Sequence, residues 1–278
     1  MLKEVDIAAS LHQKGFVLID ADLLAEIKEL NDFIEHNYPI TSDDFYYSLI
    51  ANDYGNNLVI KSFISDTLSA FYDRYFDPYH SRNESFLSKP KQTATELLLH
   101  QDWNYTDESK FAVYNVWIPL RDVNTDNGAM FFLPGSHLWL NNLRSATLPT
   151  ARIASHSFSN DDMEVVEMKS GQVLVFHPAV FHGSMPNKSN NSRTIITSTI
   201  AERDAPFCYY QKDETDEQVK IFSLKDDAFM KGLHELSFGA DPEGTVTEVL
   251  SYKHREVTAD LLESHLAQQK KEYRYKCI

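Results

Sequence analysis

The sequence predicts an antiparallel β sandwich or barrel flanked by helices. Between about residues 84 and 202, short runs of β-branched and aromatic residues alternate with turn-forming stretches such as 187–191. No helical pattern separates these runs, which argues against a parallel α/β sheet. Apolar residues at helical spacing precede this region, and charged, helical sequence follows it. We therefore expect one domain over 1–278, with N-terminal helices in 1–83, a β core at about 84–202 and a helical C-terminal segment in 203–278.

Composition supports a globular domain and excludes several classes of function. Of the 278 residues, 42% are hydrophobic, and single all-β domains commonly reach about 250 residues. The net charge of −15 argues against a nucleic-acid partner, because neutralising phosphates requires clustered Lys and Arg. The two cysteines provide no disulfide framework. With a charged N-terminus and no apolar run of about 18 residues, the sequence predicts a cytoplasmic protein without membrane association.

The N-terminal region predicts two packed helices and one strand. A helical pattern over residues 4–13 stops at Gly15, and residues 16–19 are typical of a strand. Asp20 is a possible N-cap for a helix that should end near residues 38–39. A second helix is expected over 63–77. The intervening residues 40–62 show no sustained period, so this segment is either a mobile, substrate-facing lid or an ordinary surface connection.

Six strands are expected in the β core. Each predicted strand is bounded by residues that tolerate tight turns. The strands are expected at 96–101, 112–120, 129–133, 162–168, 172–177 and 194–200.

The tripeptide His100-Gln101-Asp102 is the first candidate for chemistry. Side chains at i and i+2 of a strand point to the same face, so an imidazole and a carboxylate would lie side by side. Non-haem Fe(II) oxygenases use two histidines and one carboxylate, which leaves open positions on the metal. Because this short motif is common by chance, a third ligand is required.

Two of the eleven histidines lie around the second half of the β core and remain candidates for that ligand, His177 and His182. His182 lies at the head of a turn that follows the apolar run 173–176. Farther along the chain, Arg193 opens the last predicted strand. A guanidinium that faces a β core needs an anion, which would be either a dicarboxylate cosubstrate or a surface acid.

Taken in order, the motifs of the β core resemble the phytanoyl-CoA dioxygenase family of Fe(II)/2-oxoglutarate oxygenases. The resemblance covers residues 84–202, and the strand at 15–19 with its following helix is also similar to the start of that family. It implies a double-stranded β-helix, a cupin-like jelly roll with the metal near one mouth of the barrel. The motifs are His100-Gln101-Asp102, the stretch 127–137 ending in Leu133-Pro134-Gly135-Ser136-His137, the stretch 171–176, His182-Gly183-Ser184 and Arg193.

The resemblance also implies roles for individual residues. His100, Asp102 and His182 match the iron ligands of the family. Arg193 matches the residue that binds the distal carboxylate of 2-oxoglutarate, and Ser184 matches a hydroxyl that assists it.

Further cosubstrate contacts are less closely matched. Trp117 resembles a family tryptophan beside the cosubstrate, although the spacing differs by one residue. Asn115 would share the face of Trp117 by strand alternation, so it could donate to a cosubstrate carboxylate. Lys89 and Lys91 are the candidates for an upstream basic group.

The implied activity is an Fe(II)-dependent dioxygenase that uses O2 and 2-oxoglutarate to hydroxylate a small organic substrate, releasing succinate and CO2. The Asp102 carboxylate favours hydroxylation, because related halogenases lack it. The alternatives are a metal-dependent jelly-roll enzyme that does not use 2-oxoglutarate and a catalytically silent ligand-binding barrel. The sequence defines neither the oligomeric state nor the substrate.

Aromatic residues suggest one substrate class. Residues 103–105 and the tyrosines of 46–54 are candidates for the rim of the pocket, and acids accompany those tyrosines. Aromatic rings beside acids would suit a small amine or zwitterion through cation–π contact, whereas packing in the core is the alternative.

Overall fold

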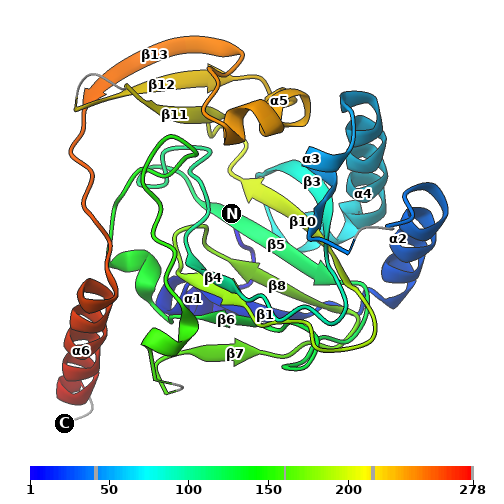
Figure 1. Ribbon diagram of the computed structural model, residues 1–278, viewed down its shortest axis with the longest axis horizontal. Helices are drawn as coiled ribbons and strands as arrows, with labels where there is room; N and C mark the ends of the chain where they lie inside the picture. The colour runs from blue at the N-terminus through cyan, green and yellow to red at the C-terminus, as the bar shows by residue number, and fades with distance from the viewer. Residues whose placement is uncertain (41–42, 160, 214–216, 277–278) are drawn as a thin grey trace.

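Two antiparallel sheets packed face to face form the centre of the protein (Figure 1). The computed structural model describes residues 1–40, 43–159, 161–213 and 217–276. The larger sheet has the strand order β1-β8-β5-β10-β3-β2, and the smaller has the order β4-β9-β6-β7. A third sheet, β11-β12-β13, lies outside this pair.

The strands of the two central sheets are β1 (Phe16–Asp20), β2 (Tyr46–Tyr47), β3 (His80–Lys89), β4 (Leu97–His100), β5 (Val113–Pro119), β6 (Met130–Phe132), β7 (Glu164–Val166), β8 (Gln172–Phe176), β9 (His182–Ser184) and β10 (Arg193–Ala201). The third sheet contains β11 (Cys208–Lys212), β12 (Gln218–Leu224) and β13 (Gly244–Ser251). The helices are α1 (Val5–Lys14), α2 (Leu24–Asn37), α3 (Ser48–Ala51), α4 (Tyr54–Tyr75), α5 (Ala228–Ser237) and α6 (Ala259–Lys276).

Strand alternation buries both faces of the larger sheet. On β8, Leu174 and Phe176 point into the core between the sheets, whereas Val173 and Val175 point outward and pack under the helices. The same outward core includes apolar residues of α1, α2 and α4, and these helices cover that face of the sheet. The six predicted strands of the β core are confirmed as β4 to β8 and β10, while β3 and β9 were not predicted.

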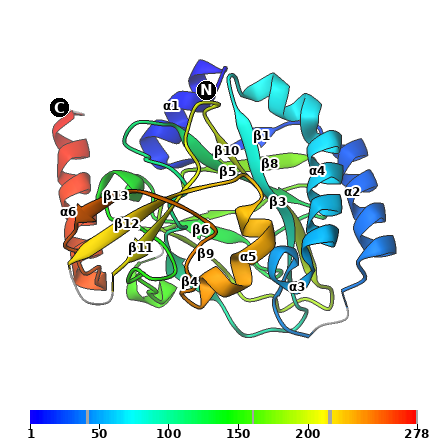
Figure 2. The same cartoon turned by 90° about the horizontal axis from the view of Figure 1, so that it is seen from above.

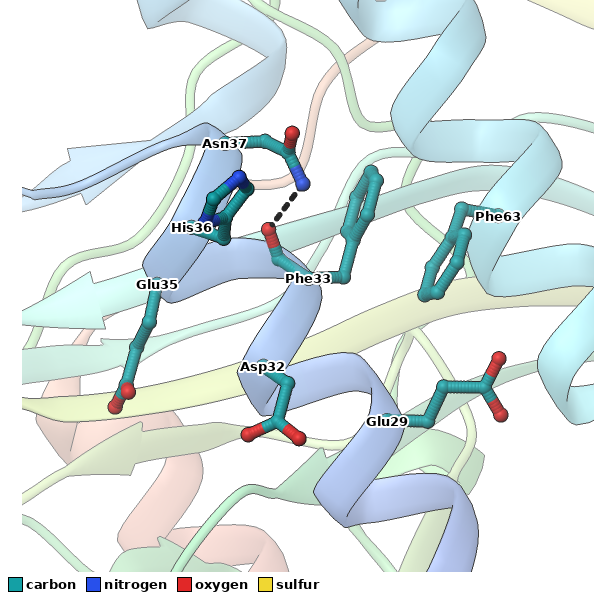
Figure 3. Close-up of a pocket in the computed structure, with 7 residues that line it drawn as sticks. All are labelled: Glu29, Asp32, Phe33, Glu35, His36, Asn37 and Phe63. Atoms are coloured by element: carbon teal, nitrogen blue, oxygen red, sulfur yellow. Dashed lines mark hydrogen bonds between the residues drawn. The ribbon is translucent and has the colours of Figure 1, made fainter.

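Helices α2 and α4 contact each other through an aromatic pair. Phe33 of α2 stacks on Phe63 of α4 with 3.8 Å between ring centroids, and Asn37 Nδ2 donates to the Phe33 carbonyl at 2.8 Å (Figure 3). The shallow pocket beside this pair is lined by acidic residues of α2. None of the candidate site residues lines this pocket.

The prediction for residues 40–62 was wrong in its local structure. Helix α4 begins at Tyr54, nine residues before the predicted start at 63, because Asp53 Oδ1 caps it by accepting from the Asn56 amide at 2.8 Å. Strand β2 and helix α3 occupy 46–51. The predicted cap at Asp20 was also wrong. Asp20 ends β1 and accepts a hydrogen bond from Gln172, and the N-cap position of α2 is Leu23.

The C-terminal segment 203–278 is not the helical region that was predicted. It contains the sheet β11-β12-β13 as well as α5 and α6. The β-branched residues of β12 and β13, such as Val219, Ile221 and Val249, favour strands. Helix α5 lies beside α3 at one end of the barrel (Figure 2). Helix α6 packs Leu262 and Leu266 against the smaller sheet. No helix in the described part of the chain is long and apolar enough to span a membrane.

Candidate metal and cosubstrate site

The smaller sheet brings the three predicted metal ligands together. Strands β4 and β9 pair with His100 opposite His182, and Asp102 lies just beyond the end of β4. The distance from His100 Nε2 to Asp102 Oδ1 is 3.6 Å, and that from His182 Nε2 to Asp102 Oδ2 is 3.5 Å. One ligand atom from each residue lies within 4.8 Å of the others, which is the spacing of donors around a single ion.

Backbone carbonyls fix the orientation of both imidazoles. His100 Nδ1 lies 2.7 Å from the Leu98 carbonyl oxygen, and His182 Nδ1 lies 2.9 Å from that of Val180. Because a carbonyl oxygen can only accept a hydrogen bond, each Nδ1 carries a proton. The lone pair of each Nε2 therefore faces the space between the three side chains, where a metal ion would bind. This donor set therefore fits a metal ion without any change of tautomer.

Electrostatics sets the protonation states of His182 and Asp102. Burial lowers the pKa of His182 to about 4, so its imidazole is neutral at pH 7. Burial raises the pKa of Asp102, but His182, His100 and Arg144 outweigh it and bring the pKa to about 2. The neutral imidazole of His182 and the carboxylate of Asp102 are thus available to a metal ion at neutral pH.

Asn115 lines the cavity and also contacts the metal-ligand candidate Asp102. Its Nδ2 donates to Asp102 Oδ2 at 2.7 Å, and Thr199 Oγ1 donates to Asn115 Oδ1 at 3.0 Å. The register of β5 and β10 places Thr199 opposite Asn115. The pair thus orients the Asp102 carboxylate, a role that strand alternation on one strand did not indicate for either residue.

A buried ion pair holds the loop that follows Asp102. Arg144 Nε donates to the Asp102 carbonyl at 2.6 Å, and Arg144 Nη2 contacts both carboxylate oxygens of Glu108 at 2.6 and 2.7 Å. The Arg144 amide also donates to Asn104 Oδ1 at 2.6 Å. Arg144 and Glu108 were missed by the sequence reasoning, because nothing local to either position indicates a partner 36 residues away.

Two buried cations lie next to each other where β10 begins and β3 ends, and one of them, Arg193, lines the cavity. Strands β10 and β3 pair with Arg193 opposite Lys89, and the side chains are 8% and 4% exposed. The Arg193 guanidinium lies 5.1 Å from the Trp117 ring, and its Nε is buried without a hydrogen-bond partner. Burial lowers the pKa of Arg193 to about 10, so it stays charged. Within the described residues no acid pairs with Arg193, contrary to the surface-acid alternative.

Lys89 does not line the cavity but lies buried beside Arg193, whereas Lys91 is exposed. Lys89 Nζ donates to Ser184 Oγ at 2.8 Å and to the Met185 carbonyl at 2.6 Å. Burial and the nearby Arg193 lower the pKa of Lys89 to about 7. Within the described residues, neither Arg193 nor Lys89 forms an ion pair with a carboxylate. Together with the Ser184 hydroxyl, these two side chains form a site suited to a bound dianion.

One cavity of about 390 Å³ contains the predicted site residues, within the usual range of about 300–1,000 Å³ for small-molecule pockets. Its lining includes His100, Asp102, Asn115, Trp117, His182, Ser184 and Arg193. His177 lies elsewhere, 5.4 Å from the His137 ring, so His182 is the third member of the cluster. At the rim, Tyr47, Trp103 and Tyr105 line the cavity, whereas Asn104 bonds to Arg144 and Tyr54 to Asp227.

The chain is similar to known proteins in sequence and in fold. A family model described as phytanoyl-CoA dioxygenase (PhyH) matches residues 11–195. A phytanoyl-CoA dioxygenase of Arabidopsis thaliana is 27% identical over 139 residues, which cover 49% of this chain and 48% of the relative. The human peroxisomal phytanoyl-CoA dioxygenase is 23% identical over 171 residues, covering 58% of this chain and 48% of the relative. The chain thus spans about half the length of the curated relatives it matches.

Solved structures confirm the predicted jelly-roll fold. HygX from Streptomyces hygroscopicus, solved with nickel, 2-oxoglutarate and hygromycin B, is 17% identical with a TM-score of 0.51, covering 72% of this chain and 88% of that protein. EvdO2 from Micromonospora carbonacea var. aurantiaca, solved with 2-oxoglutarate, is 14% identical with a TM-score of 0.51, covering 73% of this chain and 93% of that protein.

Proposed function

The chain belongs to the phytanoyl-CoA dioxygenase family, and on this premise we propose that it is an Fe(II)- and 2-oxoglutarate-dependent oxygenase that hydroxylates a small organic substrate. One observation carries the proposal. A cluster of two imidazoles and one carboxylate shares a cavity with a buried guanidinium that has no acidic partner among the described residues. Such a cavity can hold a metal ion and a dicarboxylate side by side.

The histidine Nε2 atoms of His100 and His182 and the carboxylate of Asp102 would hold Fe(II). Three protein ligands leave positions open for a chelating cosubstrate and for dioxygen. When bound, the iron would supply the redox chemistry with O2, and the cosubstrate would leave as succinate and CO2. The hydrogen bond from Asn115 holds the Asp102 carboxylate in place for this task.

Arg193 would bind the distal carboxylate of 2-oxoglutarate through its planar fork of donors. The Ser184 hydroxyl, which accepts a hydrogen bond from Lys89, lies in the same lining and would assist. Trp117 contributes an apolar ring on which the guanidinium rests. A metal-dependent barrel that does not use 2-oxoglutarate would leave Arg193 as an uncompensated buried charge, which is unfavourable.

The apolar part of the lining would exclude water from the reacting groups. Phe176 and Met130 lie in the core between the sheets and also line the cavity beside His182. We further propose a cytoplasmic location, in keeping with the free and buried thiol of Cys208.

A succinate assay tests the proposed function. The purified protein is incubated with Fe(II), 2-oxoglutarate, O2 and a library of metabolites, and succinate and the oxidised compound are measured. We expect succinate release that requires Fe(II) and is stimulated by at least one compound, and that disappears in Asp102→Ala. Equal release by wild type and Asp102→Ala would contradict the proposal.

A further inference from the structure

The outer part of the cavity combines apolar walls with a single charged side chain. Phe45, which precedes β2, and Ile50 of α3 are 51% and 44% exposed, and Leu233 of α5 lies beside them in the lining. Among the lining residues, the acidic and basic side chains other than histidine are Asp102, Arg193 and Arg152. Since the first two belong to the metal and cosubstrate site, Arg152 is the charged group that faces the outer part of the cavity.

Backbone pairing places Arg152 next to a metal-ligand candidate. The Leu99 amide donates to the Ile153 carbonyl at 2.9 Å, and the Ile153 amide donates to the Leu99 carbonyl at 3.0 Å, which forms an antiparallel bridge. His100 and Arg152 are therefore cross-strand neighbours whose side chains share a face. Leu99 and Ile153 point the other way, into the core beneath the smaller sheet. Arg152 thus emerges beside His100 on the cavity side.

Arg152 differs from two other arginines, Arg144 and Arg82, in its pairing within the described residues. Arg144 is paired with Glu108, and Arg82 is paired with Asp226. Across the described ranges, by contrast, no carboxylate or carbonyl oxygen accepts a hydrogen bond from the exposed Arg152 guanidinium. In a chain with a net charge of −15, an unpaired guanidinium at the mouth of a cavity provides a local site for an anion.

We propose that Arg152 binds an oxyanion of the substrate, which is therefore an organic acid with an apolar body that packs against Phe45, Ile50 and Leu233. The proposal rests on the proposed function, which makes this cavity the substrate site. It replaces the small amine expected from the aromatic residues, because the acids at 43, 44 and 53 do not line the cavity. A guanidinium matches a carboxylate through two parallel hydrogen bonds, and this geometry selects anions over amides and amines.

Two series of ligands, each with one apolar body and three different head groups, test this inference by calorimetry. The anaerobic protein, loaded with Fe(II) and 2-oxoglutarate, is titrated with 3-phenylpropanoate, 3-phenylpropanamide and 3-phenylpropylamine, and with octanoate, octanamide and octylamine. Wild type should bind at least one carboxylate about tenfold more tightly than its amide. Arg152→Gln should remove this preference, and Arg152→Glu should shift it toward the amine. Arg121→Gln, at an exposed arginine outside the cavity, should behave like wild type.

A titration of the Fe(II) protein with 2-oxoglutarate, done before the others, separates the inference from the proposed function. If wild type fails to bind 2-oxoglutarate, the proposed function is wrong. If 2-oxoglutarate binds equally well to wild type and to Arg152→Gln, the cosubstrate site is intact in both proteins. The head-group preference then decides whether the inference about Arg152 holds. A wild-type protein that prefers no carboxylate of the set, or a preference that persists in Arg152→Gln, overturns the inference. Because Arg152 is exposed, circular dichroism should show the same fold in every variant.

Discussion

Replacement of Arg193 by leucine should remove tight binding of 2-oxoglutarate and leave the ligand-free fold at least as stable. The guanidinium is 8% exposed, lies against Trp117 and has a buried Nε without a partner. In the ligand-free protein it is therefore a buried charge without compensation, which is unfavourable. Leucine removes that charge and can still pack on the indole ring. A purely structural arginine would instead lose stability on substitution.

The size of the affinity loss follows from the burial of the charge. Removing one partner of a desolvated charge pair costs about 2 to 5 kcal/mol, which corresponds to about 30-fold to 4,000-fold in affinity. We expect the lower part of this range, because Lys89 lies opposite Arg193 and remains. Without the neighbouring charge of Arg193, the pKa of Lys89 rises and its ammonium is retained at neutral pH.

Calorimetric titration of the anaerobic Fe(II) protein with 2-oxoglutarate measures this loss, and thermal unfolding of the ligand-free protein measures stability. Arg193→Lys keeps the charge and should fall between wild type and Arg193→Leu. Arg121→Leu is the control for loss of an arginine elsewhere. Affinity within threefold of wild type in Arg193→Leu, or a lower melting temperature without an affinity loss, would refute the reasoning.

Four further predictions concern other residues in and beside the candidate site. His100→Ala should lose stoichiometric Fe(II), measured by metal analysis after anaerobic reconstitution, because a facial triad needs both imidazoles; iron content equal to wild type would show that His100 is not a ligand. Asn115→Leu should weaken Fe(II) binding by about 10-fold to 100-fold, because Asp102 loses its orienting donor; a loss confined to 2-oxoglutarate affinity would instead favour the cosubstrate role predicted from the sequence. The affinity for 2-oxoglutarate should fall as pH rises above about 7, because the folded pKa of Lys89 is about 7 and the dianion binds its protonated form. Lys89→Met should flatten this pH profile, and an unchanged slope in that variant would exclude Lys89 as the group that causes it. Since this folded pKa lies below the ordinary value of 10.5, Lys89 should also make the ligand-free wild type more stable as pH rises from about 7 toward 10.5, and denaturant titrations at several pH values measure that change.

The ligands could be predicted to the extent that their signals are local. Strand alternation predicted that His100 and Asp102 lie close together, although Asp102 lies just past the end of β4. The β-branched and aromatic residues of β1, β5, β8 and β10 identified four of the six strands of the larger sheet. Strand β9 escaped prediction because it has three residues and contains Gly183, which is typical of a turn. Here glycine serves close packing, since a Cβ at this position would lie 2.3 Å from the Leu97 carbonyl oxygen.

The remaining features depend on contacts between distant segments. The hydrogen bond from Asn115 to Asp102 and the ion pair of Arg144 with Glu108 form only when the fold brings separate loops and strands together. The C-terminal sheet was missed because its alternating pattern is short: it stops at the bulge after Ile221 in β12, and β13 shows no regular alternation. Arg152 gives no sequence signal at all, since its place beside His100 arises from one isolated bridge.

Anaerobic titration with Fe(II), followed by 2-oxoglutarate, tests the central claim most directly. We expect wild type to bind Fe(II) stoichiometrically and to develop the visible charge-transfer absorption of an Fe(II)–2-oxoacid chelate. His182→Ala should show neither property while its circular dichroism stays that of the folded protein. Fe(II) binding and chelate absorption of equal strength in wild type and His182→Ala would contradict the assignment of this cavity as an iron and 2-oxoglutarate site.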